Sequence, residues 1–536
     1  MKKVAHNTRE IEAEHAGDLE KILKGHDTKV PHPRGGHGPG GSRGGSHPKR
    51  RGRNQVKSPR TEGRPLDTRE CPGEPVDIAT GRMFIDQTDA WLPGSLPLAF
   101  TRNFESGLVT GRWMGPKWIC TFDERLEIDE DGVVHIRPDR ITQAYPHPEP
   151  GDPVHASAGS RHELDHVEGL YTVTDPATGL VKEFTPTPDG DEALLTVVRD
   201  RLGRHYTLAY DQDGVPLSIT HSGGYQLLVT VDADRITALR LAKAGDTGGD
   251  ALLTRYSYTD GHLTAVYNSS GRPMRFTNDA HGRLTSWTDR NNSQYRYTYD
   301  HLGRVTDEGG TDGFLRFTFS YGDRDPDTGL RTHTETNALG HTTTYMINDH
   351  AQVIAVTDPL GRTTRYEYDG AGDLIAITRP DGARSTSTYT DRLGLPAIVT
   401  GAGGATWQHT YDSAGLQLTL TDPIGAVTRF SYDERGHRAS VTDASGSTTR
   451  FTCNAAGMPI EVTHPGGTAP TPRTSLAGAL VLPAGLRQPP TGLHALTLHP
   501  AQPRKRRISD VGQRPAAHRS GATAHRSRRP DPKRRL

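Results

Sequence analysis

The chain has 536 residues, of which 32% are hydrophobic, 6% aromatic and 24% charged, and it contains 60 glycines and 38 prolines. Glycine and proline at this frequency argue against a helix-rich enzyme, because both residues destabilise helix interiors. No run of about 18 apolar residues is present, so the sequence predicts no transmembrane segment. The length fits about two to four domains, or one long repetitive β architecture.

The net charge of zero conceals a segregation of charge along the chain. Residues 1–60 carry 14 Lys and Arg against 6 Asp and Glu, and residues 465–536 carry 14 against 2. The residues between these ends carry 36 basic and 56 acidic side chains. Because an acidic body repels phosphate, we do not expect the body to bind nucleic acid. A weaker alternative is nucleic-acid association through the basic ends.

Residues 1–70 are predicted to form a basic arm that is rich in glycine and proline. A short helix is expected within residues 1–23, although it is too short to be stable alone. Residues 31–60 contain eight glycines and no acidic residue, a composition typical of a disordered linker. Their RGG-like spacing permits weak RNA contact, but a solvated linker is the favoured interpretation.

The chain start lacks the apolar segment of a secretory signal peptide. We therefore expect a protein that is cytoplasmic as made, and that is secreted or reaches the cell surface only through a dedicated secretion apparatus. The three cysteines, Cys71, Cys120 and Cys453, are too few and too scattered for a disulfide framework or a zinc ribbon.

Residues 71–160 are predicted to form a β domain. Short apolar runs, such as the one that contains Leu96, Leu98 and Phe100, are separated by Gly, Pro and Asp, which is typical of strands and hairpins. The tryptophans at 91, 113 and 118 are expected to lie in the core of this domain, since no convergent polar residues accompany them.

Residues 161–467 are periodic. An Asp or Asn is followed three residues later by Gly, and successive pairs are 21 or 22 residues apart. The predicted turn residues are Asp279, Gly282, Asp300, Gly303, Asp369, Gly372, Asp391, Gly394, Asp412, Gly415, Asp433, Gly436, Asn454 and Gly457. A second glycine ends most units, as at Gly361, Gly382, Gly425 and Gly446.

One unit shows how the pattern specifies structure. In Thr363–Asp369 the side chains alternate, so Thr364, Tyr366 and Tyr368 share one face of a strand. Asp369 is suited to start a turn and Gly372 to take the positive φ that the turn needs. A hairpin of about 21 residues cannot bury its apolar face alone, so neighbouring hairpins must stack. The fold class is therefore all-β, with tandem hairpins in a curved, spiralling sheet.

These residues carry a resemblance to a known family. The Tyr-Asp-x-x-Gly-x-Leu unit, with Asp-Pro-x-Gly between units, resembles the YD repeat of Rhs proteins. The segment Pro75–Gly81, followed by Leu96–Leu98 and Arg102–Phe104, is similar to the domain that precedes those repeats in bacterial Rhs polymorphic toxins. The resemblance implies a β-cage that encloses a C-terminal toxin and serves competition between bacteria. It also implies an immunity protein as a partner of that toxin.

The resemblance ends near residue 467. Residues 468–536 contain no Phe, Trp or Tyr and are rich in Pro and Arg, so we expect a disordered tail or the product of a shifted reading frame. We accordingly interpret the chain as an N-terminal fragment: the pre-repeat domain and a partial β-cage, without closure or toxin. Such a sheet would end at an unpaired strand near residues 454–463 and favour self-association.

The function expected from these features is that of a non-catalytic structural shell, and the alternative is a module that binds surface carbohydrate through its Tyr, Thr and Asp ladders. One motif argues for an enzyme: His162-Glu163-Leu164-Asp165-His166 matches the H-E-x-x-H zinc motif. That motif needs a helix, and the flanking turn signals leave no room for one. We therefore expect no metal, no cofactor and no catalytic residue.

Overall fold

The computed structural model describes residues 52, 59–73, 75–92, 96–244, 248–454 and 459–468, all within one compact unit, Met1–His499. The helix expected within residues 1–23, nearly all of the linker 31–58, Gly457 and the tail from 469 onward lie outside the described residues. No helix among the described residues has the length and apolar character needed to cross a membrane.

Helix is scarce in the described part of the chain. It comprises the one-turn helix α3 (Pro59–Glu62) and the 3-10 helices η1 (Leu66–Thr68), η2 (Thr121–Asp123) and η3 (Thr311–Gly313). Two of these elements, α3 and η1, fall in the segment that composition places in the disordered arm. Residues 59–70 are instead packed in the structure, because Glu62 and Arg64 are buried and form ion pairs.

The first four strands form a small antiparallel sheet, in the order β1-β2-β3-β4. We call this sheet, with the loops between its strands, the inner domain. Its strands are β1 (Val76–Asp77), β2 (Arg82–Leu92), β3 (Leu98–Glu105) and β4 (Trp118–Cys120).

All remaining strands belong to one long antiparallel sheet, which we call the shell. They are β5 (Arg125–Asp129), β6 (Gly132–Ile136), β7 (Thr142–Tyr145), β8 (Val154–His155), β9 (Glu163–Val167), β10 (Leu170–Asp175), β11 (Leu180–Pro186), β12 (Glu192–Arg199), β13 (His205–Tyr210), β14 (Pro216–His221), β15 (Gln226–Asp232), β16 (Arg235–Leu241), β17 (Ala251–Thr259), β18 (His262–Tyr267), β19 (Pro273–Asn278), β20 (Leu284–Thr288), β21 (Gln294–Tyr299), β22 (Val305–Gly310), β23 (Phe317–Tyr321), β24 (Arg331–Asn337), β25 (Thr342–Ile347), β26 (Val353–Thr357), β27 (Thr363–Tyr368), β28 (Leu374–Thr378), β29 (Arg384–Tyr389), β30 (Pro396–Thr400), β31 (Thr406–Tyr411), β32 (Gln417–Thr421), β33 (Val427–Tyr432), β34 (Arg438–Thr442), β35 (Thr448–Cys453), β36 (Pro459–His464) and β37 (Gly467–Thr468).

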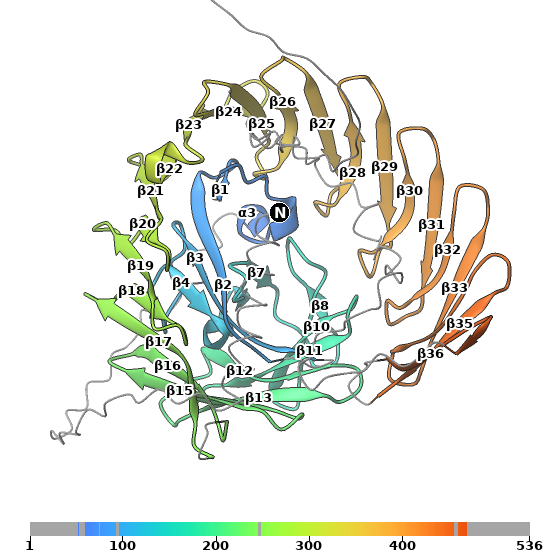
Figure 1. Cartoon of the computed structure of the whole chain (residues 1–536), viewed down its shortest axis with the longest axis horizontal. Coiled ribbons are helices and arrows are strands. Elements are labelled where there is room, and N and C mark those ends of the chain that lie inside the picture. Colours follow the sequence, from blue (N-terminus) through green and yellow to red (C-terminus); the bar gives the residue numbers. More distant parts are fainter. Residues whose placement is uncertain are drawn as a thin grey trace, which may run out of the picture. The chain divides into compact units, whose positions relative to one another are not determined.

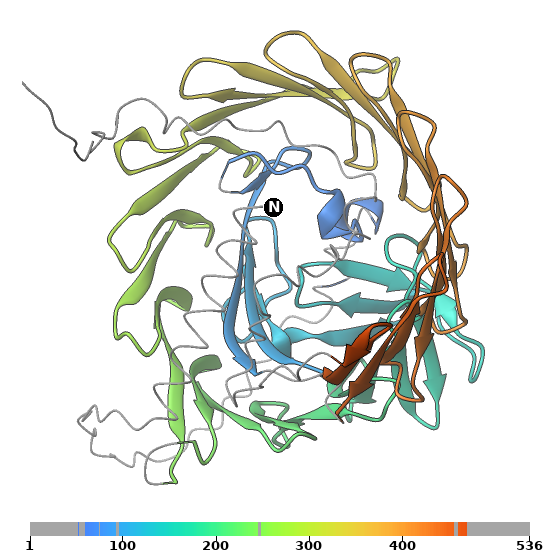
Figure 2. The ribbon, with the colours of Figure 1, turned by 45° about the vertical axis from the view of Figure 1, so that its right-hand side comes forward.

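From β8 to β37 each strand of the shell pairs with the next along the chain. The sheet branches once, at β12, which pairs with β11 and β13 and also with β5 of the hairpin β5–β6. The second half of the predicted domain 71–160 therefore belongs to the shell. Figures 1 and 2 show the shell curving around the inner domain until its last strands lie beside β9–β13. The predicted all-β spiral of hairpins is confirmed.

The hydrophobic core is shared between the inner domain and the concave face of the shell. Phe100, Phe104 and Trp118 of the inner domain belong to the same buried cluster as Phe276 and Leu284 of the shell. Trp118 contacts Phe104 with ring centroids 5.1 Å apart and Phe276 at 5.2 Å. Trp113 and Trp118 are thus core residues, as the sequence predicts, whereas the prediction is wrong for Trp91, which is 36% exposed.

Candidate functional site: the inner wall of the shell

The repeat turns determine how successive hairpins are joined. In the turn after β27, the carboxylate of Asp369 accepts hydrogen bonds from the backbone N–H groups of Ala371 and Asp373, both at 2.9 Å. The Gly372 N–H donates to the Asp369 carbonyl at 3.1 Å, and Gly372 has φ of +95°. A β-bulge lies between Glu367 and Tyr368, just before this turn. The turn chemistry read from the sequence is what closes the hairpin.

The same arrangement recurs at other predicted pairs, which are Asp279 with Gly282, Asp300 with Gly303, Asp412 with Gly415 and Asp433 with Gly436. One position differs from the prediction. Before Gly394 the first turn residue is Thr390 and not Asp391, because this turn is one residue longer: Gly394 N–H donates to the Thr390 carbonyl at 2.9 Å. Asn454 directly follows β35.

Many hairpins are also tied to the preceding one by a tyrosine, in an interaction that we call the tyrosine clasp; Ile347 and Cys453 stand at the equivalent position of two others. The hydroxyl of Tyr368 donates to the Val353 carbonyl at 3.1 Å, and that of Tyr432 donates to the Gln417 carbonyl at 2.9 Å. The clasp also spans 15 residues at four further tyrosines, Tyr210, Tyr299, Tyr389 and Tyr411, and 16 residues at Tyr321. These hydroxyls are engaged within the wall, which removes them from the ladder that carbohydrate binding would need.

The inner domain contacts the shell along a long arc of strands. Backbone bonds join Ile236 N–H to the Trp113 carbonyl and Val305 N–H to the Gly81 carbonyl, each at 2.9 Å. His221 donates through Nε2 to the Leu96 carbonyl, a distance of 2.8 Å. His333 donates through Nδ1 to a carbonyl of the inner domain at the same distance. The inner domain therefore serves as the support around which β14–β26 are arranged.

Buried ion pairs hold the inner domain together. Glu105, which is 1% exposed, pairs with Arg69 and Arg82, each at 3.0 Å. Arg102 pairs with Asp89 through two bonds of 2.7 and 3.0 Å, and Asp89 also accepts a hydrogen bond from the Tyr256 hydroxyl of the shell at 2.8 Å. Separating the partners of such a pair would leave an uncompensated charge in the interior, which is strongly destabilising. Each pair therefore holds the elements that carry it in one arrangement.

A buried carboxyl pair lies where the segment before β1 meets β24 and β25. Burial first, and then the charge of Glu335, raises the pKa of Glu70 to about 7. Glu335 accepts a hydrogen bond from the Tyr345 hydroxyl at 2.9 Å. The contact between these elements therefore favours a protonated Glu70.

The spiral meets itself at a seam between turns. Arg161 pairs with Asp373 at 2.8 Å, and Arg392 pairs with Glu163 at 3.5 Å. The guanidinium of Arg204 donates to His437 Nε2 at 3.0 Å, across 233 residues. The ladders of the described strands do not join β36 or β37 to β9–β13, so side chains and turns form this seam. The unpaired strand predicted near residues 454–463 is wrong in position, because β36 pairs with both β35 and β37; among the described strands the sheet ends instead at β37, which pairs with β36.

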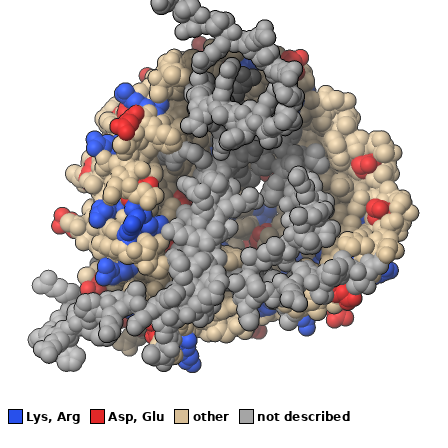
Figure 3. All heavy atoms as spheres, viewed as in Figure 1, with Lys and Arg blue, Asp and Glu red and all other residues tan. Residues whose placement is uncertain are grey.

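Inward side chains repeat once per hairpin, and their burial changes along the chain. Phe276, Tyr297, Phe319, Tyr345 and Tyr366 are between 3% and 6% exposed. The equivalent residues of the last repeats, Phe430 and Phe451, are only partly buried, as are Val441 and Val462 opposite them. We call these four residues the open inner stripe. Many outward positions of the shell are polar, although Leu252, Ile398 and Leu418 are exposed there. Figure 3 shows charged side chains dispersed over the visible surface.

The H-E-x-x-H segment is a strand and not a helix. Glu163–Val167 forms β9, and His162 directly precedes it, so residues 162 and 166 are separated by about 13 Å along this extended segment. His166 stacks on Tyr171 with a centroid distance of 4.1 Å. Burial and then the Arg137 charge lower the pKa of His162 to about 3. The two histidines cannot ligate one ion together, and we retain the prediction that this segment holds no metal.

Two family models match the chain. A domain of unknown function, DUF6531, matches residues 73–145. The RHS repeat model matches five times, at residues 279–314, 349–384, 368–406, 411–448 and 432–469. The chain is an Rhs repeat protein.

Curated relatives agree with this family. The Rhs chain is 28% identical over 253 residues to the probable deoxyribonuclease RhsA of Dickeya dadantii, covering 46% of this chain and 17% of the relative. It is 25% identical over 263 residues to double-stranded DNA deaminase toxin A of Burkholderia cenocepacia, covering 44% of this chain and 18% of that one. The matched region is thus under a fifth of the length of these relatives.

Two solved structures match the chain with TM-scores well below 0.5. The crystal structure of TcdB2-TccC3-TEV matches with a TM-score of 0.34 and 12% identity, covering 68% of the Rhs chain and 25% of that chain. The Photorhabdus luminescens Tc holotoxin pore matches with a TM-score of 0.33 and 13% identity, covering 68% and 28%.

Sequence reasoning missed the clasp, the seam and the buried charges of the inner domain. The clasp could have been recognised in the sequence, because its tyrosines directly precede the turn residue and recur with the repeat. No sequence pattern indicates the seam or the Glu70–Glu335 contact, since both join residues more than 200 positions apart.

Proposed function

We propose that this Rhs chain forms a non-catalytic wall of a toxin-delivery protein, and that its inner face holds a polypeptide cargo. The open inner stripe carries the proposal. Phe430, Phe451, Val441 and Val462 continue the row of apolar residues that the inner domain covers in earlier repeats, yet they are partly exposed. This exposed apolar surface occupies the same inward positions that are buried in the earlier repeats. It can therefore bind an unfolded or loosely folded polypeptide, which exposes apolar groups of its own.

The chemistry of the inner wall supports a structural role. Its buried carboxylates and guanidiniums are arranged in ion pairs that join elements, and none of the described His, Cys, Asp and Glu groups forms a cluster suited to a metal ion. The activities in the names of the relatives belong to proteins of which this region is a small part. We assign such an activity to the cargo, with an immunity protein as its partner.

A protection assay tests the cargo role. A small reporter domain is fused after the last residue of the chain, and its digestion by proteinase K is compared with that of an equimolar mixture of chain and free reporter. We expect the fused reporter to be digested at least three times more slowly. Arginine at both Phe430 and Phe451 should abolish the difference.

The matched control places arginine at Ser431 and Thr452, which neighbour the two phenylalanines in sequence but lie on the outer face. This variant should protect the reporter as the unmodified chain does. Equal digestion of fused and free reporter would contradict the cargo role. Cleavage or deamination of double-stranded DNA by the purified chain would contradict the non-catalytic role.

A further inference from the structure

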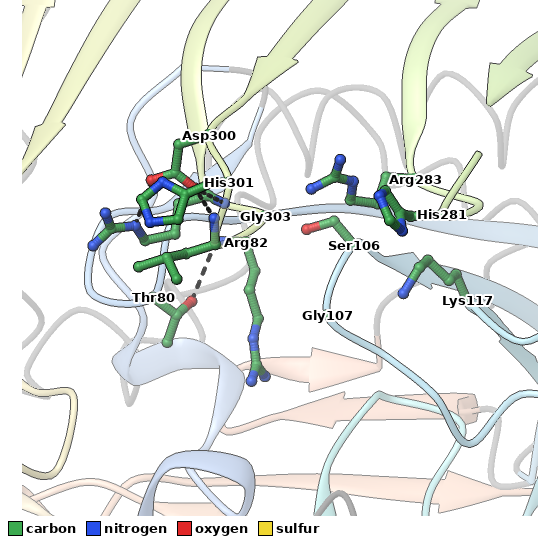
Figure 4. A pocket seen from close by; sticks show the side chains of 12 residues that line it. Thr80, Arg82, Ser106, Gly107, Lys117, His281, Arg283, Asp300, His301 and Gly303 are labelled. Carbon is green, nitrogen blue, oxygen red and sulfur yellow. Dashed lines mark hydrogen bonds and ion pairs between the residues drawn. The ribbon is translucent and has the colours of Figure 1, made fainter. Parts of the chain in front are cut away.

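A cavity of about 590 Å³ lies between the inner domain and two turns of the shell. The inner domain contributes the start of β2 and the loop between β3 and β4. The shell contributes the turn between β19 and β20 and the turn between β21 and β22 (Figure 4). The cavity therefore opens at a contact that two separate parts of the chain create.

Cationic side chains predominate in the lining of this cavity. Arg82, Lys117, Arg283 and Arg304 line it together with one carboxylate, Asp300. Arg82 is already paired with Glu62 and Glu105, so the other three cations carry the argument. The imidazoles of His281 and His301 also lie at its wall. This composition is opposite to that of the body as a whole, in which acidic residues outnumber basic ones. The local charge, and not the net charge of the body, determines what such a cavity attracts.

Two of the guanidiniums are fixed in place before any ligand binds. Arg283 donates through Nε to Asp279 at 2.7 Å, and its guanidinium lies 4.7 Å from the centre of the Tyr299 ring. Arg304 has the equivalent bond to Asp300 at 2.8 Å and the equivalent ring contact at 4.7 Å. A guanidinium held through Nε and stacked on a ring keeps its terminal nitrogens in a fixed plane, where they can donate to an oxyanion.

Lys117 supplies a cation of another kind. Its Nζ donates to the Leu108 carbonyl at 3.1 Å and forms no ion pair with a carboxylate of the described residues. Burial, and then the nearby charge of Arg283, lowers the pKa of Lys117. An anion in the cavity would offset both effects, because it would supply the missing opposite charge.

We propose that this cavity binds a small phosphate-bearing ligand. A phosphate group offers several oxygens and a double negative charge, which matches two oriented guanidiniums and one ammonium. The volume exceeds that of a single phosphate, so an organic group attached to the phosphate has room beside it. Since the ligand contacts the inner domain and the shell at once, its binding stabilises their contact.

Titration of the full chain with inorganic pyrophosphate tests the site, by calorimetry and by thermal unfolding, against chloride at the same ionic strength. We expect saturable binding that Lys117→Gln and Arg283→Gln each weaken at least tenfold. Two variants are matched controls and should bind within twofold of the unmodified chain. Lys243→Gln removes a lysine from the turn between β16 and β17. Arg362→Gln removes an arginine that pairs with Asp358 as Arg283 pairs with Asp279, but that lies in a turn outside the cavity.

Absence of saturable binding by the unmodified chain would overturn the proposal. So would equal weakening by all four substitutions, since this would indicate general charge screening. If Arg283→Gln lowers the melting temperature and thereby obscures binding, Lys117→Gln decides the question, because within the described residues the Lys117 ammonium donates a single hydrogen bond, to the Leu108 carbonyl.

Discussion

The repeats that surround the inner domain and the repeats that follow β28 have the same local construction but differ in what stabilises them. Both have the Asp-Gly turn, the β-bulge and the tyrosine clasp. In the first group the inward residues are buried against the inner domain, as Phe276 is against Trp118. In the second group the inward residues Val399 and His409 are still buried, whereas Phe430 and Phe451 of the last repeats are partly exposed.

This difference separates two contributions that repeat proteins usually combine. The repeat sequence specifies the hairpin and its connection to the next one, which are nearest-neighbour properties. The inner domain adds burial that no repeat can provide alone. We therefore expect the early repeats to unfold together with the inner domain and the last repeats to open independently, at a lower free energy.

The largest effect is expected from the shared core. Trp118→Ala removes a side chain that is 3% exposed and contacts both parts, so it should lower the free energy of unfolding by about 3–5 kcal/mol. Phe451→Ala, in the open inner stripe, should cost about 1 kcal/mol. Urea unfolding followed by circular dichroism measures both. Equal costs would show that the two regions are stabilised alike.

The seam offers the next test, through glycine turns of the later repeats. Gly415 has φ of +79°, and a Cβ there would lie 2.5 Å from the Ala177 carbonyl oxygen across the seam. Gly425 has φ of +84° and open space around it. Gly415→Val should therefore cost about 3 kcal/mol and Gly425→Val about 1 kcal/mol. Similar melting temperatures for the two variants would argue that the seam does not form.

A pH dependence is expected where the inner domain supports the shell. The pKa of Glu70 is about 7 in the fold and lies near 4.5 in an unfolded chain. Its stabilising contribution is thus complete below about pH 4.5 and is lost as the pH rises through 7. Between pH 4.5 and pH 8 the unmodified chain should lose about 1–3 kcal/mol of its free energy of unfolding through this group, and Glu70→Gln should remove that loss. Unfolding at pH 5 and pH 8 tests this, with Glu461→Gln in the last repeats as the control.

The smallest effect concerns the clasps. Tyr299→Phe leaves the Leu284 carbonyl without its 2.7 Å hydrogen bond beside the inner domain, and Tyr432→Phe does the same to the Gln417 carbonyl in a more exposed repeat. We expect costs of about 2 and about 1 kcal/mol, because Leu284 is 0% and Gln417 7% exposed, so water replaces the lost bond more readily in the second case. Hydrogen exchange should increase locally in each variant. A larger effect at Tyr432 would reverse the comparison.

The hairpins could be predicted from the sequence because their determinants are local. Asp369 and Gly372 close their turn with atoms no more than four residues apart, and side-chain alternation assigns Tyr366 to the buried face. The error at Asp391 has the same origin: a turn with one additional residue moves the first position to Thr390, which composition alone does not reveal.

The support for the shell could not be predicted, because it depends on pairs far apart in the chain. Asp89 and Tyr256 are 167 residues apart, and Leu96 and His221 are 125 apart. Composition also misplaced residues 59–70, since their glycine and charge content resembles that of the arm. Arg64 and Glu62 are instead buried in ion pairs, and a charged residue reveals its partner only in the folded structure.

The seam has a consequence for how such a wall can change in length during evolution. Arg201 donates a hydrogen bond to the Ala414 carbonyl, 213 residues further along the chain. Contacts of this kind require that one full turn of the spiral contains a whole number of hairpins. Insertion or loss of one complete hairpin advances every later turn by one position and presents an equivalent turn to the seam. A partial hairpin would reverse the alternation of faces and place apolar residues outside. Change by whole units is therefore the route that preserves the wall.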